Sequence, residues 1–213
     1  APDGAREKDV VLAIARRVSA RLRRMGTKVV LTRTGDIAVP LANRAAIATA
    51  IRADLFLSLH LNSMPTAAQR RRSQGVETYF LSADATDTHA KAVAARENAD
   101  RLAGEPGADP DDPVAGILDD LQDADALRGS SRLAYAVHER LVVRLRAEDR
   151  GVKQAPFYVL AGARMPAILL EVGFISHPEE ARRLRSREYQ ERIAEAVAEG
   201  VRSFRTEARR ASR

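Results

Sequence analysis

The stretch Asp54-Leu-Phe-Leu-Ser-Leu-His60-Leu-Asn62 decides the fold, because it is a short apolar run that ends in polar side chains. Such a run predicts a buried β-strand whose polar residues lie at its carboxyl end. In open α/β sheets ligands bind beyond the carboxyl ends of strands, so His60 lies where chemistry is expected. A single histidine is more often a core or surface residue, so metal ligation by His60 needs support from the rest of the chain.

Length and composition limit the function classes. The 213 residues, 45% hydrophobic and 30% charged, suffice for one domain with an inserted segment. No apolar run approaches the roughly 20 residues of a membrane span. Cysteine is absent, which excludes disulfides, thiolate catalysis and Cys-ligated zinc. The net charge of +6 suits an anionic cell-envelope surface as well as nucleic acid, but aromatic residues are 4% and no nucleic-acid-binding module is recognisable. We therefore expect no nucleic-acid partner.

Helical and strand patterns alternate along the chain. Predicted helices cover residues 6–25, 40–51, 86–102, 114–121, 130–145, 179–184 and 189–205, and predicted strands cover residues 27–33, 54–60, 75–81, 154–160 and 167–171. The polar segment 63–73 is expected to be a loop. This order predicts an α/β fold: a mostly parallel twisted sheet flanked by helices, with a helical insertion and with the first strand missing from the chain.

The insertion falls within residues 83–150 and contains an acidic segment. Residues 102–127 include no Lys, Arg or His but many Asp and Glu, and the apolar stripe from Val114 to Leu121 predicts a short amphipathic helix. Two interpretations stay open. The segment is either a solvated surface loop or a part of the chain that docks on a cationic site of this molecule or of a partner.

Glu7, His60 and Glu171 are each placed at the end of a predicted element. Alone, Glu7 is explained by the helix dipole, and Glu171 by a salt bridge with an arginine. Together they indicate a zinc hydrolase, because a catalytic zinc needs nitrogen or oxygen ligands and a nearby carboxylate that accepts a proton from water. His60 and Glu7 are then candidate ligands and Glu171 the candidate base. The other histidines offer no convincing third ligand: His89, His138 and His177.

Motifs along nearly the whole chain carry a resemblance to a known family. They are Arg6-Glu7-Lys8-Asp9, Val30-Leu-Thr-Arg33 with Asp36, Pro40-Leu41 with Asn43-Arg44, Ala53-Asp54-Leu55-Phe56, Ser58-Leu-His60-Leu-Asn62, Gly75-Val-Glu-Thr-Tyr79, Arg150-Gly-Val-Lys153, and Leu170-Glu171-Val-Gly-Phe-Ile-Ser176 followed by Pro178. In these motifs the chain resembles the zinc-dependent type-3 family of N-acetylmuramoyl-L-alanine amidases, in particular the AmiC-like cell-separation amidases.

The resemblance implies a catalytic domain over residues 1–213 that cleaves the amide between N-acetylmuramic acid and L-alanine of peptidoglycan. It implies zinc as the cofactor, Glu7 and His60 as ligands, and Glu171 as the catalytic acid/base. The family's further histidine ligand follows the first strand, upstream of Glu7. We therefore expect the domain to be N-terminally incomplete and this chain alone to bind zinc weakly and be inactive. Asn62 and Arg33, at predicted strand ends, are candidate substrate contacts.

The long insertion resembles the long forms of this family, in which a regulatory helical segment covers the zinc cleft until an activator protein withdraws it. On this resemblance Glu97, in Ala95-Arg-Glu-Asn98, is the candidate that contacts the metal and inhibits the enzyme. The family also implies a periplasmic or extracellular location in the cell envelope. The alternative function is a catalytically degenerate module of the same fold that binds peptidoglycan or a divisome partner.

Overall fold

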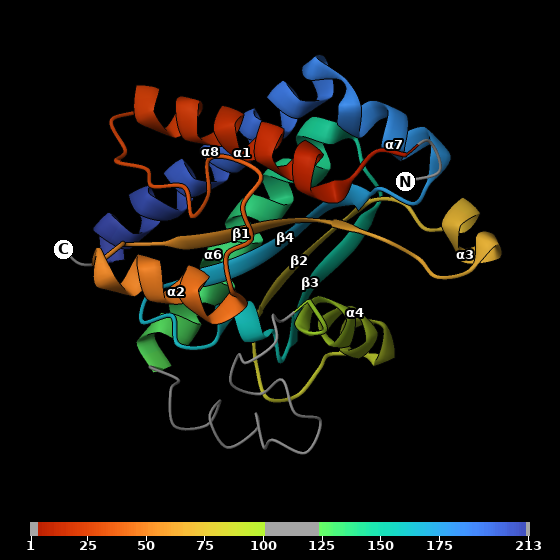
Figure 1. Ribbon diagram of the computed structural model, residues 1–213. Coiled ribbons are helices and arrows are strands. Elements are labelled where there is room, and N and C mark those ends of the chain that lie inside the picture. The colour runs from red at the N-terminus through yellow and green to blue at the C-terminus, as the bar shows by residue number, and fades with distance from the viewer. Residues whose placement is uncertain (1–3, 101–123, 212–213) are drawn as a thin grey trace.

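The computed structural model describes residues 4–100 and 124–211, and the statements below concern these residues. A sheet with strand order β1-β4-β2-β3 forms the middle layer (Figure 1). The strands are β1 (Phe56–Asn62), β2 (Val76–Leu81), β3 (Asp149–Ala155) and β4 (Ala167–Phe174). The β1–β4 and β2–β3 pairs are parallel and the β2–β4 pair is antiparallel, so the predicted mostly parallel α/β sheet is confirmed.

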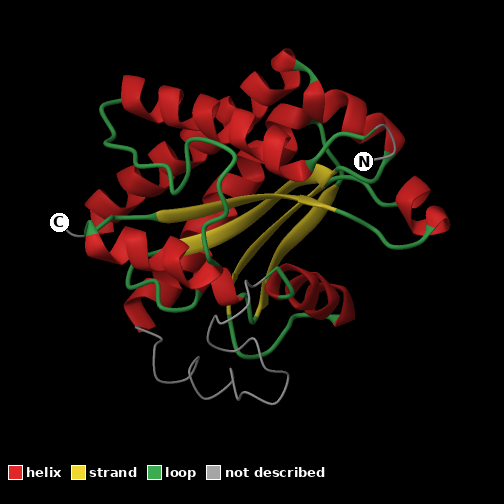
Figure 2. Cartoon of the chain, viewed as in Figure 1, coloured by secondary structure: helices red, strands yellow, loops and turns green. Residues whose placement is uncertain are grey.

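Helices cover both faces of this sheet (Figure 2). They are α1 (Glu7–Arg24), α2 (Leu41–Ala50), α3 (Ala67–Arg72), α4 (Thr88–Asn98), α6 (Ala124–Leu145), α7 (Pro178–Arg185) and α8 (Arg187–Ala211), with a 3₁₀ turn at Tyr158–Leu160. Helices α1, α6 and α8 pack on one face, whereas α2, α4 and the 3₁₀ turn pack on the other. Among the described residues, no helix is both long and apolar enough to cross a bilayer.

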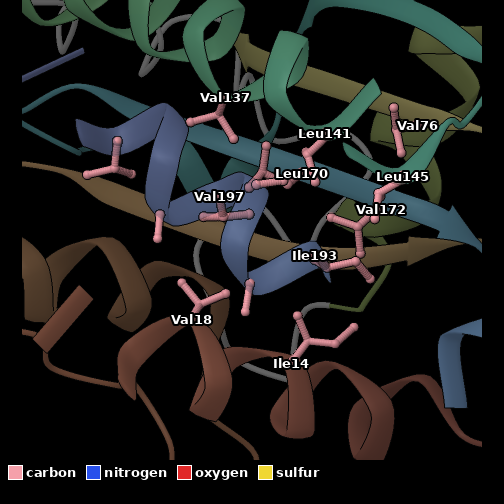
Figure 3. Close-up of a cluster of buried hydrophobic side chains, with 14 of the residues drawn as sticks. Ile14, Val18, Val76, Val137, Leu141, Leu145, Leu170, Val172, Ile193 and Val197 are labelled. Atoms are coloured by element: carbon pink, nitrogen blue, oxygen red, sulfur yellow. The ribbon is translucent and has the colours of Figure 1, made fainter. Parts of the chain in front are cut away.

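The side chains of each strand point alternately to the two faces of the sheet, and this gives the molecule two hydrophobic cores. Successive side chains of a strand face opposite sides, so Leu61 of β1 joins the core under α1, α6 and α8, and Phe56 joins the core under α2 and α4. Figure 3 shows the first of these cores, in which Ile14 and Val18 of α1 lie opposite side chains of the sheet and of α8. Every residue of β4 is buried, as expected for a central strand covered on both faces.

The predicted strand at residues 27–33 is wrong, because this segment forms no ladder with any described strand. Its polar groups bond to side chains instead. The carbonyl oxygen of Val29 accepts from Arg23 Nη2 at 2.8 Å, and the hydroxyl of Thr27 accepts from Arg205 Nη1 at 2.7 Å. A β-branched composition therefore does not by itself make a strand.

Other elements also differ from the predictions. The segment expected to be a loop contains α3, because Thr66 and Gln69 form a capping box in which each side chain accepts from the other residue's backbone N–H. The strand expected at residues 154–160 lies earlier in the chain: β3 begins at Asp149 and ends at Ala155, since Pro156 has no N–H to continue the ladder, and residues 158–160 form the 3₁₀ turn. The predicted helix at residues 114–121 lies outside the described residues.

Candidate active site

A row of polar side chains crosses the sheet near the carboxyl end of β1. His60 of β1 pairs with Glu171 of β4, and Glu171 pairs with Glu77 of β2. Paired positions in neighbouring strands present their side chains to the same face, so these three residues, here called the polar row, lie side by side under α4. All three are buried: the whole residues are 8%, 1% and 0% exposed, respectively.

Two helix ends bring carboxylates to His60. Its Nδ1 lies 2.8 Å from Glu97 Oε2, at the end of α4, and 3.3 Å from Glu7 Oε1, in the first turn of α1. Glu7 is oriented by the backbone N–H of Leu61, which donates to the same Oε1 at 3.1 Å. The structure therefore places the predicted ligands, Glu7 and His60, and the predicted inhibitory residue, Glu97, in one cluster.

This cluster fits a metal ion. One ligand atom from each of Glu7, His60 and Glu97 lies within 4.8 Å of the others. Although Nδ1 of His60 is close to both carboxylates, it has no partner in hydrogen-bonding alignment among the described residues, so these atoms converge without satisfying one another. The other ring nitrogen, Nε2, lies 3.2 Å from Ser58 Oγ, and this contact turns Nδ1 toward the carboxylates. One imidazole nitrogen with carboxylate oxygens is a donor set that zinc accepts.

The pKa values of the groups in this cluster are strongly shifted. Burial opposes protonation of His60, but the nearby carboxylates of Glu7 and Glu97 outweigh it and raise the pKa of the imidazole to about 10. Burial likewise opposes ionisation of Glu97, but the neighbouring imidazole lowers the pKa of that carboxyl below its ordinary value. The carboxylates thus favour a positive charge at His60, and a bound cation would take the place of the imidazole proton that supplies this charge.

Glu171 differs from the other carboxyl groups because neither of its oxygens has a hydrogen-bond partner among the described residues. Burial, and then the negative charge of Glu97, raises the pKa of Glu171 well above its ordinary value. An unpaired buried carboxyl group is costly for folding, and such groups concentrate at functional sites. Its register position sets it beside His60 on the same face of the sheet, and its role as the general base stays a prediction.

The two predicted substrate contacts lie in different places. Asn62 is fully buried and already bonded: its Nδ2 donates to Glu77 Oε2 at 2.9 Å, and its Oδ1 accepts from Arg96 Nη2 at 2.8 Å. Arg33 donates to the backbone oxygens of Lys8 and Gly35, beside the first turn of α1. The structure therefore joins Asn62 to the polar row and leaves Arg33 supporting the segment that carries Glu7.

Sequence reasoning missed Glu77 as a site residue. This fully buried carboxylate accepts hydrogen bonds from the side chains of Asn62, Tyr79, His89 and Arg150. Burial opposes its ionisation, but the hydrogen bonds from His89, Tyr79 and Arg150 lower its pKa to about 2. The available signal was a charged residue inside the otherwise apolar strand that begins at Gly75.

Comparison with known proteins identifies the family. A family model described as N-acetylmuramoyl-L-alanine amidase matches residues 1–203. The chain belongs to this amidase family. It is 36% identical over 204 residues to N-acetylmuramoyl-L-alanine amidase AmiA of Escherichia coli (strain K12), covering 95% of this chain and 69% of that protein. It is also 36% identical over 201 residues to AmiC of Escherichia coli O6:H1, covering 93% of this chain and 47% of that protein.

Solved structures of amidases share the fold. The chain is similar to N-acetylmuramoyl-L-alanine amidase AmiC2 of Nostoc punctiforme, with a TM-score of 0.68 and 29% identity over 94% of this chain and 84% of that one. An amidase from Clostridium difficile 630 gives a TM-score of 0.68 at 28% identity. The resemblance to the amidase family and the α/β fold class are thereby confirmed.

Proposed function

We propose that this protein is a peptidoglycan hydrolase that cleaves the amide between N-acetylmuramic acid and L-alanine with zinc as its cofactor. Membership of the amidase family supports the reaction. The observation that carries the proposal is the register match of His60 and Glu171, which sets the imidazole proposed to bind the metal beside an unpaired carboxyl group in the adjacent strand. A module that only binds peptidoglycan has no need of such a carboxyl group.

His60 and Glu7 hold the zinc ion in this proposal. When bound, zinc supplies Lewis acidity, which polarises the substrate carbonyl and lowers the pKa of water. Ser58 fixes the ring of His60 through Nε2, and the Leu61 N–H fixes the Glu7 carboxylate. These contacts would keep both side chains oriented toward the bound ion.

Glu171 is the proton carrier. It accepts the proton of the attacking water and returns it to the nitrogen of the leaving amine, which departs as the amino group of L-alanine. A general acid must hold its proton near neutral pH, and the raised pKa of Glu171 suits this half of the cycle. The negatively charged Glu97 contributes to that shift, so the pKa of Glu171 depends on where α4 lies.

We further propose that α4 inhibits the enzyme in this conformation. This proposal is supported by the 2.8 Å approach of Glu97 Oε2 to His60 Nδ1, which would keep substrate or water away from that nitrogen. The neighbouring residues fasten the end of α4 at either side: Arg96 donates to the oxygen of Ser63, and Asn98 bonds the backbone of Pro156 and Tyr158. An activator protein that withdraws α4 would expose the polar row.

The substrate implies a location in the periplasmic or extracellular cell envelope. The net charge of +6 suits an anionic wall polymer. The proposed partners are accordingly peptidoglycan and an activator that acts on the regulatory segment.

The reaction is tested by digesting purified cell walls with the full-length Glu97→Ala protein and analysing the products by mass spectrometry. We expect stem peptides with a free L-alanine amino terminus, and loss of product after chelation with recovery on added zinc. Glu188→Gln, an exposed change on α8, is the matched control and should not alter the yield. Cleavage elsewhere in the wall, or binding of the wall without any cleavage, would refute the proposed reaction.

A further inference from the structure

Arg96 of α4 fills a pair of oxygen acceptors at the end of β1. Its Nη1 donates to the backbone oxygen of Ser63 at 2.6 Å, and its Nη2 donates to Asn62 Oδ1 at 2.8 Å. Asn62 and Ser63 closely follow His60 in the chain, and Asn62 belongs to β1 itself. The acceptor pair therefore adjoins the metal cluster on the side covered by α4.

Glu77 determines which side-chain atom of Asn62 faces Arg96. A carboxylate can only accept hydrogen bonds, so the amide of Asn62 must turn its Nδ2 toward Glu77, and this leaves Oδ1 pointing to Arg96. Glu77 is itself immobilised, because Arg150 Nε donates to it at 2.6 Å and Tyr79 OH at 2.7 Å. Neither the carboxylate nor the amide can rotate without losing a buried hydrogen bond.

The chemistry of the pair defines its ligand. Both oxygens accept hydrogen bonds from N–H groups of the guanidinium, so an N–H group of a peptide can take the place of the guanidinium, and peptide N–H groups adjoin the scissile bond of the proposed substrate. Resting on the proposed function, we propose that Glu77 is a positioning residue, which holds Asn62 Oδ1 and Ser63 O as a subsite for a stem-peptide N–H, and that Arg96 fills this subsite in the covered state.

The subsite takes the N–H of the residue after L-alanine. The scissile nitrogen has to face Glu171 on β4 to receive its proton, whereas Asn62 lies on the neighbouring strand, past the irregularity in β1 that follows His60. The next N–H along the stem peptide is the nearest donor left to bind there. Arg96 and the substrate N–H are then direct competitors for this subsite.

Binding, rather than turnover, tests this assignment. The probes are acetyl-L-alanyl-D-isoglutamine and an analogue methylated on the nitrogen of the peptide bond that joins L-alanine to isoglutamine. Both are titrated by NMR against Arg96→Met, a substitution that keeps the packing of the arginine stem. We expect the N–H probe to bind Arg96→Met more tightly than it binds the unaltered protein, and about five- to tenfold more tightly than the methylated probe binds, the size of one net hydrogen bond. Adding Asn62→Leu should abolish this discrimination.

The role of Glu77 has its own signature. In the Arg96→Met background, Glu77→Gln presents an NH₂ group to Asn62, so the Asn62 amide flips, its Nδ2 faces the probe and discrimination is lost. Asn62→Asp alone replaces the amide that donates to Glu77 with a second carboxylate, and the two carboxylates repel each other. In the double variant, Glu77→Gln with Asn62→Asp, the new amide donates to one oxygen of the new carboxylate while the other oxygen accepts from the probe, so discrimination returns.

A merely structural role for Glu77 predicts no such rescue, and thermal unfolding confirms which variants are folded. Equal binding of the two probes to Arg96→Met, absence of binding, or additive losses in the double variant would each overturn the subsite. These outcomes are independent of the proposed function, because the probes are scored by affinity; a protein that discriminates the probes but never cleaves cell walls would contradict the reaction and not the subsite.

Discussion

At the residue scale, the site is distinguished by polar groups that lack partners. The oxygens of Glu171 and the Nδ1 of His60 are buried without an aligned hydrogen bond among the described residues, whereas the nearby Glu77 carboxylate accepts four side-chain donors. Burial alone therefore does not mark the reactive groups. A satisfied carboxylate positions its neighbours, and an unsatisfied one is available for a ligand or a proton.

Ser58 is expected to strengthen zinc binding by orienting the ring of His60. Ser58→Ala removes the contact to Nε2, which frees the ring to rotate, and should weaken zinc binding by about 10- to 100-fold, the usual effect of losing an outer-shell partner. A competition titration against a chromogenic chelator measures this loss. Ser203→Ala on α8 is the control, and an unchanged affinity for Ser58→Ala would show that the ring is held by other groups.

Glu77 should make stability depend on acid pH. Its folded pKa of about 2 lies below the ordinary value of 4.5, so its stabilising effect is complete above about pH 4.5 and is lost as the pH falls toward 2. Urea unfolding should show Glu77→Gln less stable than the wild type by about 3 kcal/mol at pH 7, with a difference that shrinks below pH 4. A difference that is constant across this range would contradict an ionised, hydrogen-bonded Glu77.

At the element scale, α4 is held over the site mainly by side-chain contacts. Asn98 joins it to the segment after β3, donating to Pro156 O and accepting from Tyr158 N, both at 2.8 Å. Asn98→Ala should therefore loosen α4 and speed hydrogen exchange of its amides by about tenfold, with no change in α6. Equal protection of α4 in the variant and the wild type would show that its apolar face is sufficient to hold it.

Sequence patterns predicted most elements because burial imposes their periodicity. The apolar run that ends at His60 is a strand in the sheet, and the helical stripe that includes Ile14 packs against the core. The segment at residues 27–33 was mispredicted because β propensity cannot show whether a partner strand exists. The short helix α3 was missed since its capping box, and not an apolar face, defines it.

The candidate site was only partly predictable. The sequence indicated Glu7, His60 and Glu171 as special positions, and the structure brings the first two into contact and the third into register; their roles as ligands and base stay predictions. Glu77 escaped notice because its importance arises from pairing across strands far apart in the chain. Such register cannot be derived from the periodicity of one segment.

At the scale of the whole molecule, close contact between α6 and α8 supports the sheet that carries the site. A Cβ on Gly200 would lie 2.5 Å from Val137 Cα and 2.8 Å from Ala136 O. Gly200→Ala should therefore force the helices apart and destabilise the fold by about 1–3 kcal/mol, measured by thermal unfolding. Gly35→Ala, where an added Cβ meets nothing within 4 Å, is the control, and similar melting of both variants would contradict the tight packing.

Metal binding and proton transfer belong to different residues of the polar row in the proposed mechanism. The most direct test of this division compares zinc content and cell-wall hydrolysis for His60→Ala and Glu171→Gln, both made in the Glu97→Ala protein. We predict that His60→Ala loses both zinc and hydrolysis, whereas Glu171→Gln keeps its zinc and loses hydrolysis by about a thousandfold, within the range for a general acid/base. Full activity of Glu171→Gln, or stoichiometric tight zinc in His60→Ala, would contradict this assignment.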